Sequence, residues 1–92
     1  MPCRRDEERY AAGGTGALTW QSGSGKHECR VNVRNISQGG VQLISKRPLQ
    51  IGWSAHLRGE QFDCIGAVKY CNPTETDYLI GIRFLSEPFF RG

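Results

Sequence analysis

The chain alternates between short runs of apolar and polar residues and clusters of turn-forming residues, and this alternation constrains its fold more than any other feature. Over residues 28–34 every second residue is apolar, and the residues between them are charged or polar. This period of two is typical of a half-buried β-strand. Residues 35–40 are rich in Asn, Ser and Gly, and the alternation resumes over residues 41–45. The two runs therefore predict a β-hairpin, with these residues facing the core: Cys29, Val31, Val33, Val41, Leu43 and Ser45.

Further strands are expected elsewhere along the chain. They cover residues 17–21, 53–57, 62–70 and 78–84, and Gly, Pro, Asn and Asp residues separate them. The segment from Tyr78 is expected to be the last strand, and Ser86 to Pro88 is the best candidate for a short helical turn. About six short strands must close or fold over to protect their edges. The chain is therefore expected to be all-β, forming a small six-stranded antiparallel β-barrel.

The length of 92 residues allows one domain. Residues 1–12 are charged and lack periodicity, and they precede a pair of glycines, Gly13 and Gly14, that reads as a hinge. We expect residues 1–12 to form a flexible N-terminal arm and residues 13–92 to form the barrel. A barrel of this size cannot enclose a large catalytic cavity.

The sequence predicts a cytoplasmic protein without a membrane span. No apolar run approaches the roughly 18 residues of a membrane helix, and the first residues are charged rather than signal-like. The four cysteines are then expected to be reduced, with Cys29 packing inward as a small apolar residue. They contain no Cys-x-x-Cys pair, and the two histidines are not at zinc-finger spacing, so no metal site is expected.

Motifs of catalysis are missing from the sequence. It contains no Gly-x-Ser-x-Gly and no His-Glu-x-x-His. The glycine-containing runs at residues 14–16 and 23–25 lack the Lys-Ser/Thr of a phosphate loop and are interpreted as a hinge and a turn. The sequon at Asn35 to Ser37 matters only in a secreted chain. We therefore expect a protein that is not an enzyme, with no catalytic residue and no cofactor.

The charge of the chain favours a small anionic ligand. The net charge is +3, which is a mild bias and not the lopsided charge of a duplex-binding protein. Its basic residues are nearly all arginines, with lysine only at Lys26, Lys46 and Lys69. Arginine suits bidentate or stacked contacts with phosphates and purines.

Two short elements carry groups suited to such a ligand. Arg5 and Arg9 are four residues apart on the arm, so both guanidinium groups can face one ligand. The segment Asn35-Ile36-Ser37-Gln38-Gly39-Gly40 offers an amide, a hydroxyl and close backbone approach at a strand end. Each element also has an ordinary interpretation: the arginines can pair loosely with residues 6–8 on a solvated arm, and Asn, Ser and Gly are preferred turn residues.

In this order the two elements resemble the PilZ domain, the bacterial receptor for cyclic di-GMP. That family has an Arg-x-x-x-Arg pair on an N-terminal arm and Asp/Asn-x-Ser-x-x-Gly at a strand end of a small β-barrel. Here the residues are Arg5 with Arg9, followed by Asn35, Ser37 and Gly40, and the ending Ile-Gly-Ile-Arg-Phe at residues 80–84 is also similar. Asn35 stands where many members have Asp, and both side chains can hydrogen-bond guanine.

The resemblance implies a function and a set of ligand-binding residues. It implies that the chain binds cyclic di-GMP, that the arm becomes ordered across the barrel when the ligand binds, and that the signal passes to a downstream protein partner. In the family, arginine at the position of Arg4 is associated with a mutually intercalated pair of ligands. The implied binding residues are Arg4, Arg5, Arg9, Asn35, Ser37 and Gly40.

Two other functions remain open at this point. A small barrel could bind single-stranded RNA or DNA, with Trp20, Trp53, Tyr70 and Tyr78 as stacking surfaces. These aromatic residues are not interleaved with a basic strand face, and packing explains each of them equally well, so no nucleic acid is expected as a partner. A barrel of the same family could also act through protein contacts alone, but the two intact motifs argue against this.

Overall fold

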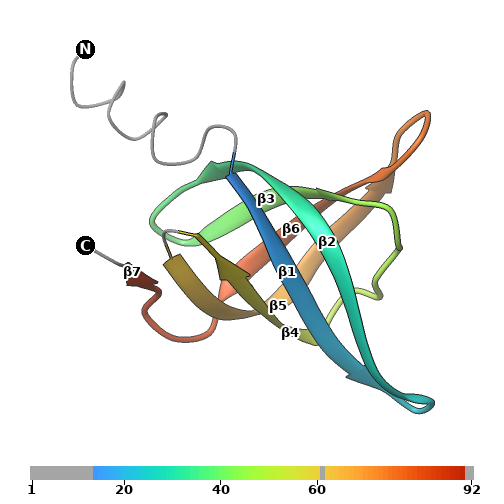
Figure 1. The fold of residues 1–92 in the computed structure, drawn as a ribbon, viewed down its shortest axis with the longest axis horizontal. Coiled ribbons are helices and arrows are strands. Elements are labelled where there is room, and N and C mark those ends of the chain that lie inside the picture. The colour runs from blue at the N-terminus through green and yellow to red at the C-terminus, as the bar shows by residue number, and fades with distance from the viewer. Residues whose placement is uncertain (1–13, 61, 91–92) are drawn as a thin grey trace.

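The computed structural model describes residues 14–60 and 62–90. These residues form strands whose arrangement is drawn in Figure 1. Their bounds are β1 (Gly14–Ser22), β2 (Gly25–Ile36), β3 (Gly40–Ser45), β4 (Ser54–Gly59), β5 (Phe62–Pro73), β6 (Tyr78–Phe84) and β7 (Phe89–Phe90). The arm expected at residues 1–12 lies outside the described residues, and Cys3, Arg4, Arg5 and Arg9 lie there with it.

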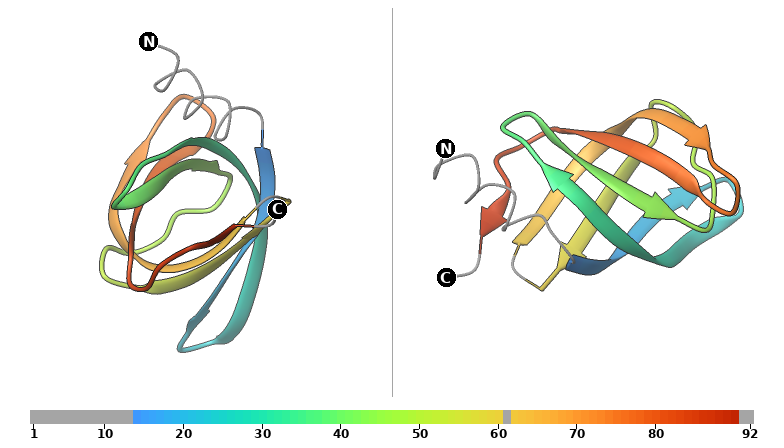
Figure 2. Two further views of the ribbon diagram at one scale, coloured as in Figure 1. Left: turned by 90° about the vertical axis from the view of Figure 1, so that its left-hand side faces the viewer. Right: turned by 90° about the horizontal axis from the view of Figure 1, so that it is seen from above.

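The strands β1 to β6 close into an antiparallel barrel, which confirms the predicted fold. Their order in the sheet is β4-β1-β2-β3-β6-β5, and a further pairing of β4 with β5 joins the two ends. The left-hand view of Figure 2 shows the barrel nearly end-on. Closure gives each of these six strands a neighbour on both sides and so protects their edges.

The segment after β6 differs from the prediction. We expected no strand beyond residue 84 and a helical turn at residues 86–88, but the chain bends there and continues into β7. Strand β7 pairs with the start of β5, and the rings of Phe90 and Phe62 stack with their centroids 5.6 Å apart. The extended conformation brings Phe90 onto the buried Phe62, and this contact outweighs the weak local preference for a single helical turn.

The first strand is longer than predicted. Gly14 pairs with Val33 and is already part of β1, so it is not a hinge. The pairing continues to Ser22 and Gly25, which are joined by a two-residue turn. Gly25 has a φ of 120°, a backbone conformation that favours glycine. Residues 14–16, which were interpreted as a hinge, and the turn at residues 23–25 therefore belong to one long, regular hairpin.

The core has the composition that the alternation predicts. The inward residues of β2 and β3 pack with those of the other strands, and Cys29 packs partly buried against them. Among the described residues, Ser45 is the polar exception in the core, and its hydroxyl donates to the Arg47 carbonyl at 2.8 Å and accepts the Arg47 N–H at 3.0 Å. The buried apolar residues are Leu18, Trp20, Val31, Val33, Val41, Leu43, Leu49, Ala55, Leu57, Phe62, Cys64, Val68, Ile80 and Ile82.

Two β-bulges reverse the alternation in β2 and β5. The register of β2 against β3 shifts between Val33 and Asn35, so Arg34 is the extra residue. Both Arg34 and Asn35 are then exposed, while Ile36 packs against the core. The register of β5 against β6 shifts in the same way between Val68 and Tyr70. A bulge bends its strand and re-aims the side chains that follow it, and both bulges lie beside the groove described next.

Candidate functional site

A row of side chains crosses four strands on the outer surface of the barrel between the two bulges. Asn35 on β2 is opposite Gln42 on β3, Gln42 is opposite Gly81 on β6, and Gly81 is opposite Tyr70 on β5. Without the bulges, strict alternation would direct Asn35 and Tyr70 into the core. The bulges therefore bring these two side chains onto the surface as the two ends of one row.

This row lies in a groove of about 460 Å³. The volume is within the range of roughly 300–1,000 Å³ typical of small-molecule sites. Three of the predicted site residues, Asn35, Ser37 and Gly40, line it together. The remaining lining residues are Gly39, Val41, Gln42, Lys69, Tyr70, Gly81, Ile82 and Arg83. The other predicted residues, Arg4, Arg5 and Arg9, lie outside the described residues.

The turn between β2 and β3 forms one end of the groove. The Ser37 N–H and hydroxyl both donate to the Gly40 carbonyl, at 2.8 and 3.3 Å. The Ser37 hydroxyl oxygen keeps its capacity to accept a hydrogen bond from a ligand. The turn is also anchored to β6, because the Phe84 N–H donates to the Gly39 carbonyl at 2.9 Å.

Gly40 allows β3 and β6 to approach each other at this end. A Cβ atom at position 40 would collide with the Ile82 carbonyl oxygen, whereas one at Gly39 would meet no atom within 4 Å. The requirement for glycine at position 40 therefore comes from strand packing. Gly40 therefore lines the groove with backbone atoms alone.

Tyr70 covers the middle of the groove floor. A Cβ atom at Gly81 would fall within the space of the Tyr70 ring, so the ring lies directly against the β6 backbone. The Gln42 side-chain N–H donates to the Tyr70 hydroxyl at 2.8 Å, which holds the ring in this orientation. A fixed aromatic ring beside polar groups is a surface on which a planar base can stack.

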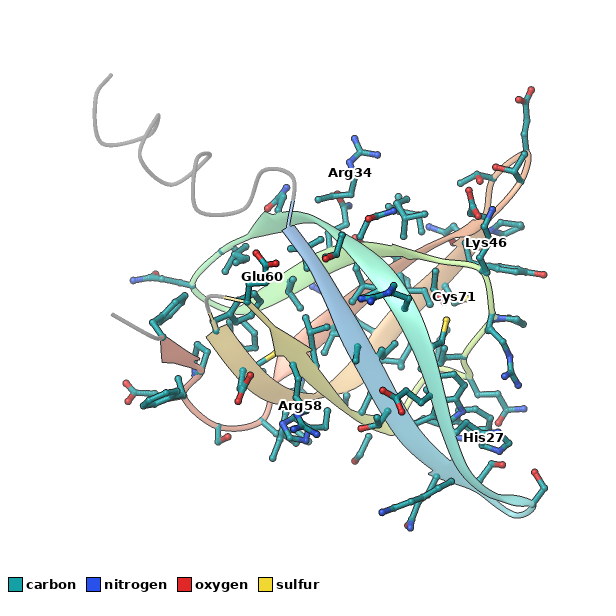
Figure 3. The ribbon with its side chains drawn as sticks, viewed as in Figure 1. His27, Arg34, Lys46, Arg58, Glu60 and Cys71 are labelled. Carbon is teal, nitrogen blue, oxygen red and sulfur yellow. The ribbon has the colours of Figure 1, made fainter. Side chains whose placement is uncertain are left out.

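The groove is positively charged. Lys69 and Arg83 line it, and its lining residues include no Asp, Glu, His or Cys. Arg34, the bulge residue next to Asn35, points away from the barrel at the same side (Figure 3). The groove thus combines cations, amide groups and an aromatic ring, which suits a planar, anionic ligand.

The sequence analysis missed four of the residues that complete this groove. Gln42 follows the motif directly on β3, whereas Lys69, Tyr70 and Arg83 come from strands distant in sequence. The period of two was the available signal for Gln42, which lies between the apolar Val41 and Leu43, and for Arg83, which lies between Ile82 and Phe84. The alternation gave no sign of the bulge at Lys69, so the outward direction of Tyr70 could not be inferred.

The aromatic residues considered for single-stranded nucleic acid do not form an exposed stacking surface. Trp20 is a core residue, and Trp53 and Tyr78 pack against the core. Tyr70 is the one of the four that lines the groove. A stacking path along a nucleic acid strand needs several exposed rings in succession, so this function gains no support.

The comparisons agree with the motifs. A sequence model of the PilZ domain matches residues 4–88, nearly the whole chain, and this range contains both motifs. No curated protein and no solved structure matches the chain significantly. Within residues 14–60 and 62–90, no helix is long and apolar enough to cross a membrane, and no group of three or more His, Cys, Asp or Glu residues is arranged to hold a metal ion.

Proposed function

The chain belongs to the PilZ domain family, whose members generally bind cyclic di-GMP, and from this premise we propose that it is a cyclic di-GMP receptor. The observation that carries the proposal is the cationic groove around Asn35, Ser37 and Gly40, with Tyr70 at its floor. These three motif residues come together on the surface, as ligand binding requires.

The ligand's chemistry matches the groups in the groove. Cyclic di-GMP has two phosphodiester groups and two guanine bases. Lys69 and Arg83 can pair with the phosphodiesters, and the Tyr70 ring offers a face on which guanine can stack. The Asn35 amide can hydrogen-bond a base edge, and Gly40 lines the groove with backbone atoms alone.

The arm is proposed to supply the other half of the site. In this proposal Arg5 and Arg9 close over the ligand and contact guanine or phosphate through their guanidinium groups. Ordering the arm costs about 1–2 kcal/mol per residue, and ligand contacts must offset this cost. We further propose that Arg4 supports an intercalated pair of ligands, because a third guanidinium can neutralise and cap the extra charge and base.

The composition of the groove supports a proposal of binding rather than catalysis. Its lining residues include no carboxylate, imidazole or thiol to act as general base or nucleophile. We propose that ligand binding is relayed to a downstream protein partner. We also propose a cytoplasmic location, since Cys29, Cys64 and Cys71 are unpaired thiols.

Calorimetry of the full chain against four ligands tests the proposal. Cyclic di-GMP is expected to give saturable heat, and cyclic di-AMP, GTP and a short single-stranded RNA are expected to give none. Heat with the RNA but not with cyclic di-GMP would replace the proposed function with the single-stranded nucleic acid alternative. Heat with none of them would refute ligand binding by this domain.

A further inference from the structure

A second groove, of about 420 Å³, lies over β1, β4 and β5 and shares no lining residue with the first. Its lining residues are Thr19, Trp20, Gln21, Lys26, Trp53, Ser54, Ala55, His56 and Ile65. We propose that it is a docking site for an acidic segment of a partner protein that carries a bulky apolar side chain. This proposal does not depend on cyclic di-GMP binding.

The distribution of exposed apolar residues identifies this side of the barrel. Four of the five large hydrophobic residues that are exposed in the described part of the chain lie on β5, on β7, which pairs with β5, or directly after β6. They are Ile65, Leu85, Phe89 and Phe90, and the fifth, Ile51, lies in the loop before β4. Clustered exposed apolar residues on a soluble domain mark an interaction surface more often than chance placement does.

Ile65 connects the groove to this apolar surface. Its side chain is 46% exposed and lines the groove beside His56, its partner across β4 and β5. The Leu85 N–H donates to the Ile65 carbonyl at 2.9 Å, so the half-exposed Leu85 lies next to it. The apolar rim thus extends beyond the groove, which suits a segment of chain better than a compact small molecule.

The floor of the groove is rigid and aromatic. Trp20 is almost fully buried, with its ring stacked on His27 at 5.6 Å and the Arg47 guanidinium 5.6 Å from its centroid. Trp53 packs half-buried against the core. Trp53 is the partly exposed ring of the two, and aromatic residues are enriched at protein interfaces because they offer contact area at low entropic cost.

The charge of the groove indicates an acidic occupant. Lys26 and His56 line it, and none of its lining residues is Asp or Glu. The nearest carboxylate by strand register belongs to Glu28, which is opposite Thr19 but does not line the groove. Charge complementarity steers partners and rejects those of the wrong sign, so a basic segment should be disfavoured here.

Selection from a random dodecapeptide library displayed on phage, with the full chain as bait and no dinucleotide present, tests the proposal. The selected peptides should be rich in Asp or Glu and carry a Phe, Leu, Ile or Trp. A synthetic selected peptide should change the tryptophan fluorescence, because both tryptophans of the chain, Trp20 and Trp53, line this groove.

Two exposed positions in the groove and two outside it provide the matched variants. Ile65→Asp and Lys26→Glu should each weaken binding of the selected peptide at least about tenfold. Ile51→Asp and Arg30→Glu make the same kinds of change at exposed positions outside the groove and should alter the affinity less than about twofold. Thermal melts of all four variants establish that each is folded.

Several results would overturn the proposal. They are the selection of no peptide, the selection of basic peptides, or binding that Ile65→Asp and Ile51→Asp weaken equally. Sedimentation velocity measures whether the chain forms dimers. If it does, and if Ile65→Asp dissociates them, the groove binds a second copy of the chain and not a partner protein. If the chain binds cyclic di-GMP but no selected peptide, the docking site is refuted and the proposed receptor function is not.

Discussion

At the scale of single residues, Gly40 is where strand packing and the binding motif coincide. Because a Cβ atom at this position would meet the Ile82 carbonyl oxygen, Gly40→Ala must push β3 away from β6. We expect a loss of roughly 1–3 kcal/mol in the free energy of unfolding, the usual cost of overpacking. Urea denaturation measures it. Gly39→Ala is the matched control, because a Cβ there meets nothing, and equal stability of the two variants would refute the packing argument.

The Cys64 thiol gives a second prediction at the residue scale. Its burial, with a contribution from the nearby Asp63 carboxylate, raises its pKa from 9.0 to about 12. The neutral thiol is therefore favoured in the folded state, so its contribution to stability is complete below pH 9 and is lost as the pH rises from about 9 towards 12. At pH 8 we expect Cys64 to react with a thiol reagent only after unfolding.

The thiol count separates this prediction from disulfide formation. In denaturant, the aerobically purified chain should give four reactive thiols, equal to its number of cysteines. Cys64→Ser should lower that count by one. It should leave the number of thiols that react in the native protein unchanged. A count below four in denaturant would indicate a disulfide and contradict the reduced state.

At the scale of elements, the sequence predicted the strands better than the site. The alternation around Val31 and Leu43 reflects burial on one face, a local property that can be read along the chain. The bulges at Arg34 and Lys69 depend on pairing with other strands, which local patterns do not reveal. The turn-forming composition of residues 35–40 therefore placed Asn35 in a turn, although it belongs to β2. The pairing of β7 with β5 is likewise a long-range contact that local preference could not indicate.

The two motifs can be tested as elements that close on one ligand. Arg5→Ala, Arg9→Ala and Ser37→Ala should each weaken cyclic di-GMP binding by roughly 1.5–3 kcal/mol, or about one to two decades in affinity. The reason is that each removes one charge-assisted or desolvated hydrogen bond. Calorimetry measures the change. Arg30→Ala, on the exposed face of β2 and outside the groove, is the control and should bind normally. Wild-type affinity in both arm variants would remove Arg5 and Arg9 from the site.

At the scale of the whole molecule, the stoichiometry reports whether the site holds one ligand or a stacked pair. With Arg4 present, two cyclic di-GMP molecules are expected per chain, because a further guanidinium offsets the added negative charge. Arg4→Leu should lower the ratio towards one or weaken the binding. A calorimetric ratio near one in the wild type, or no effect of the substitution, would exclude the intercalated pair and leave the receptor function intact.

The two grooves of the barrel share no lining residue, so the position of the ligand is the most direct test of the receptor function. The bound ligand can be located from amide chemical shifts. These are recorded on the ¹⁵N-labelled full chain during a titration with cyclic di-GMP. The largest changes are expected at the turn and floor of the first groove, at Ser37, Gly40, Tyr70 and Gly81. Residues of the second groove such as Lys26 and His56 should change little. Changes centred on the second groove, or no saturable change at all, would contradict the account.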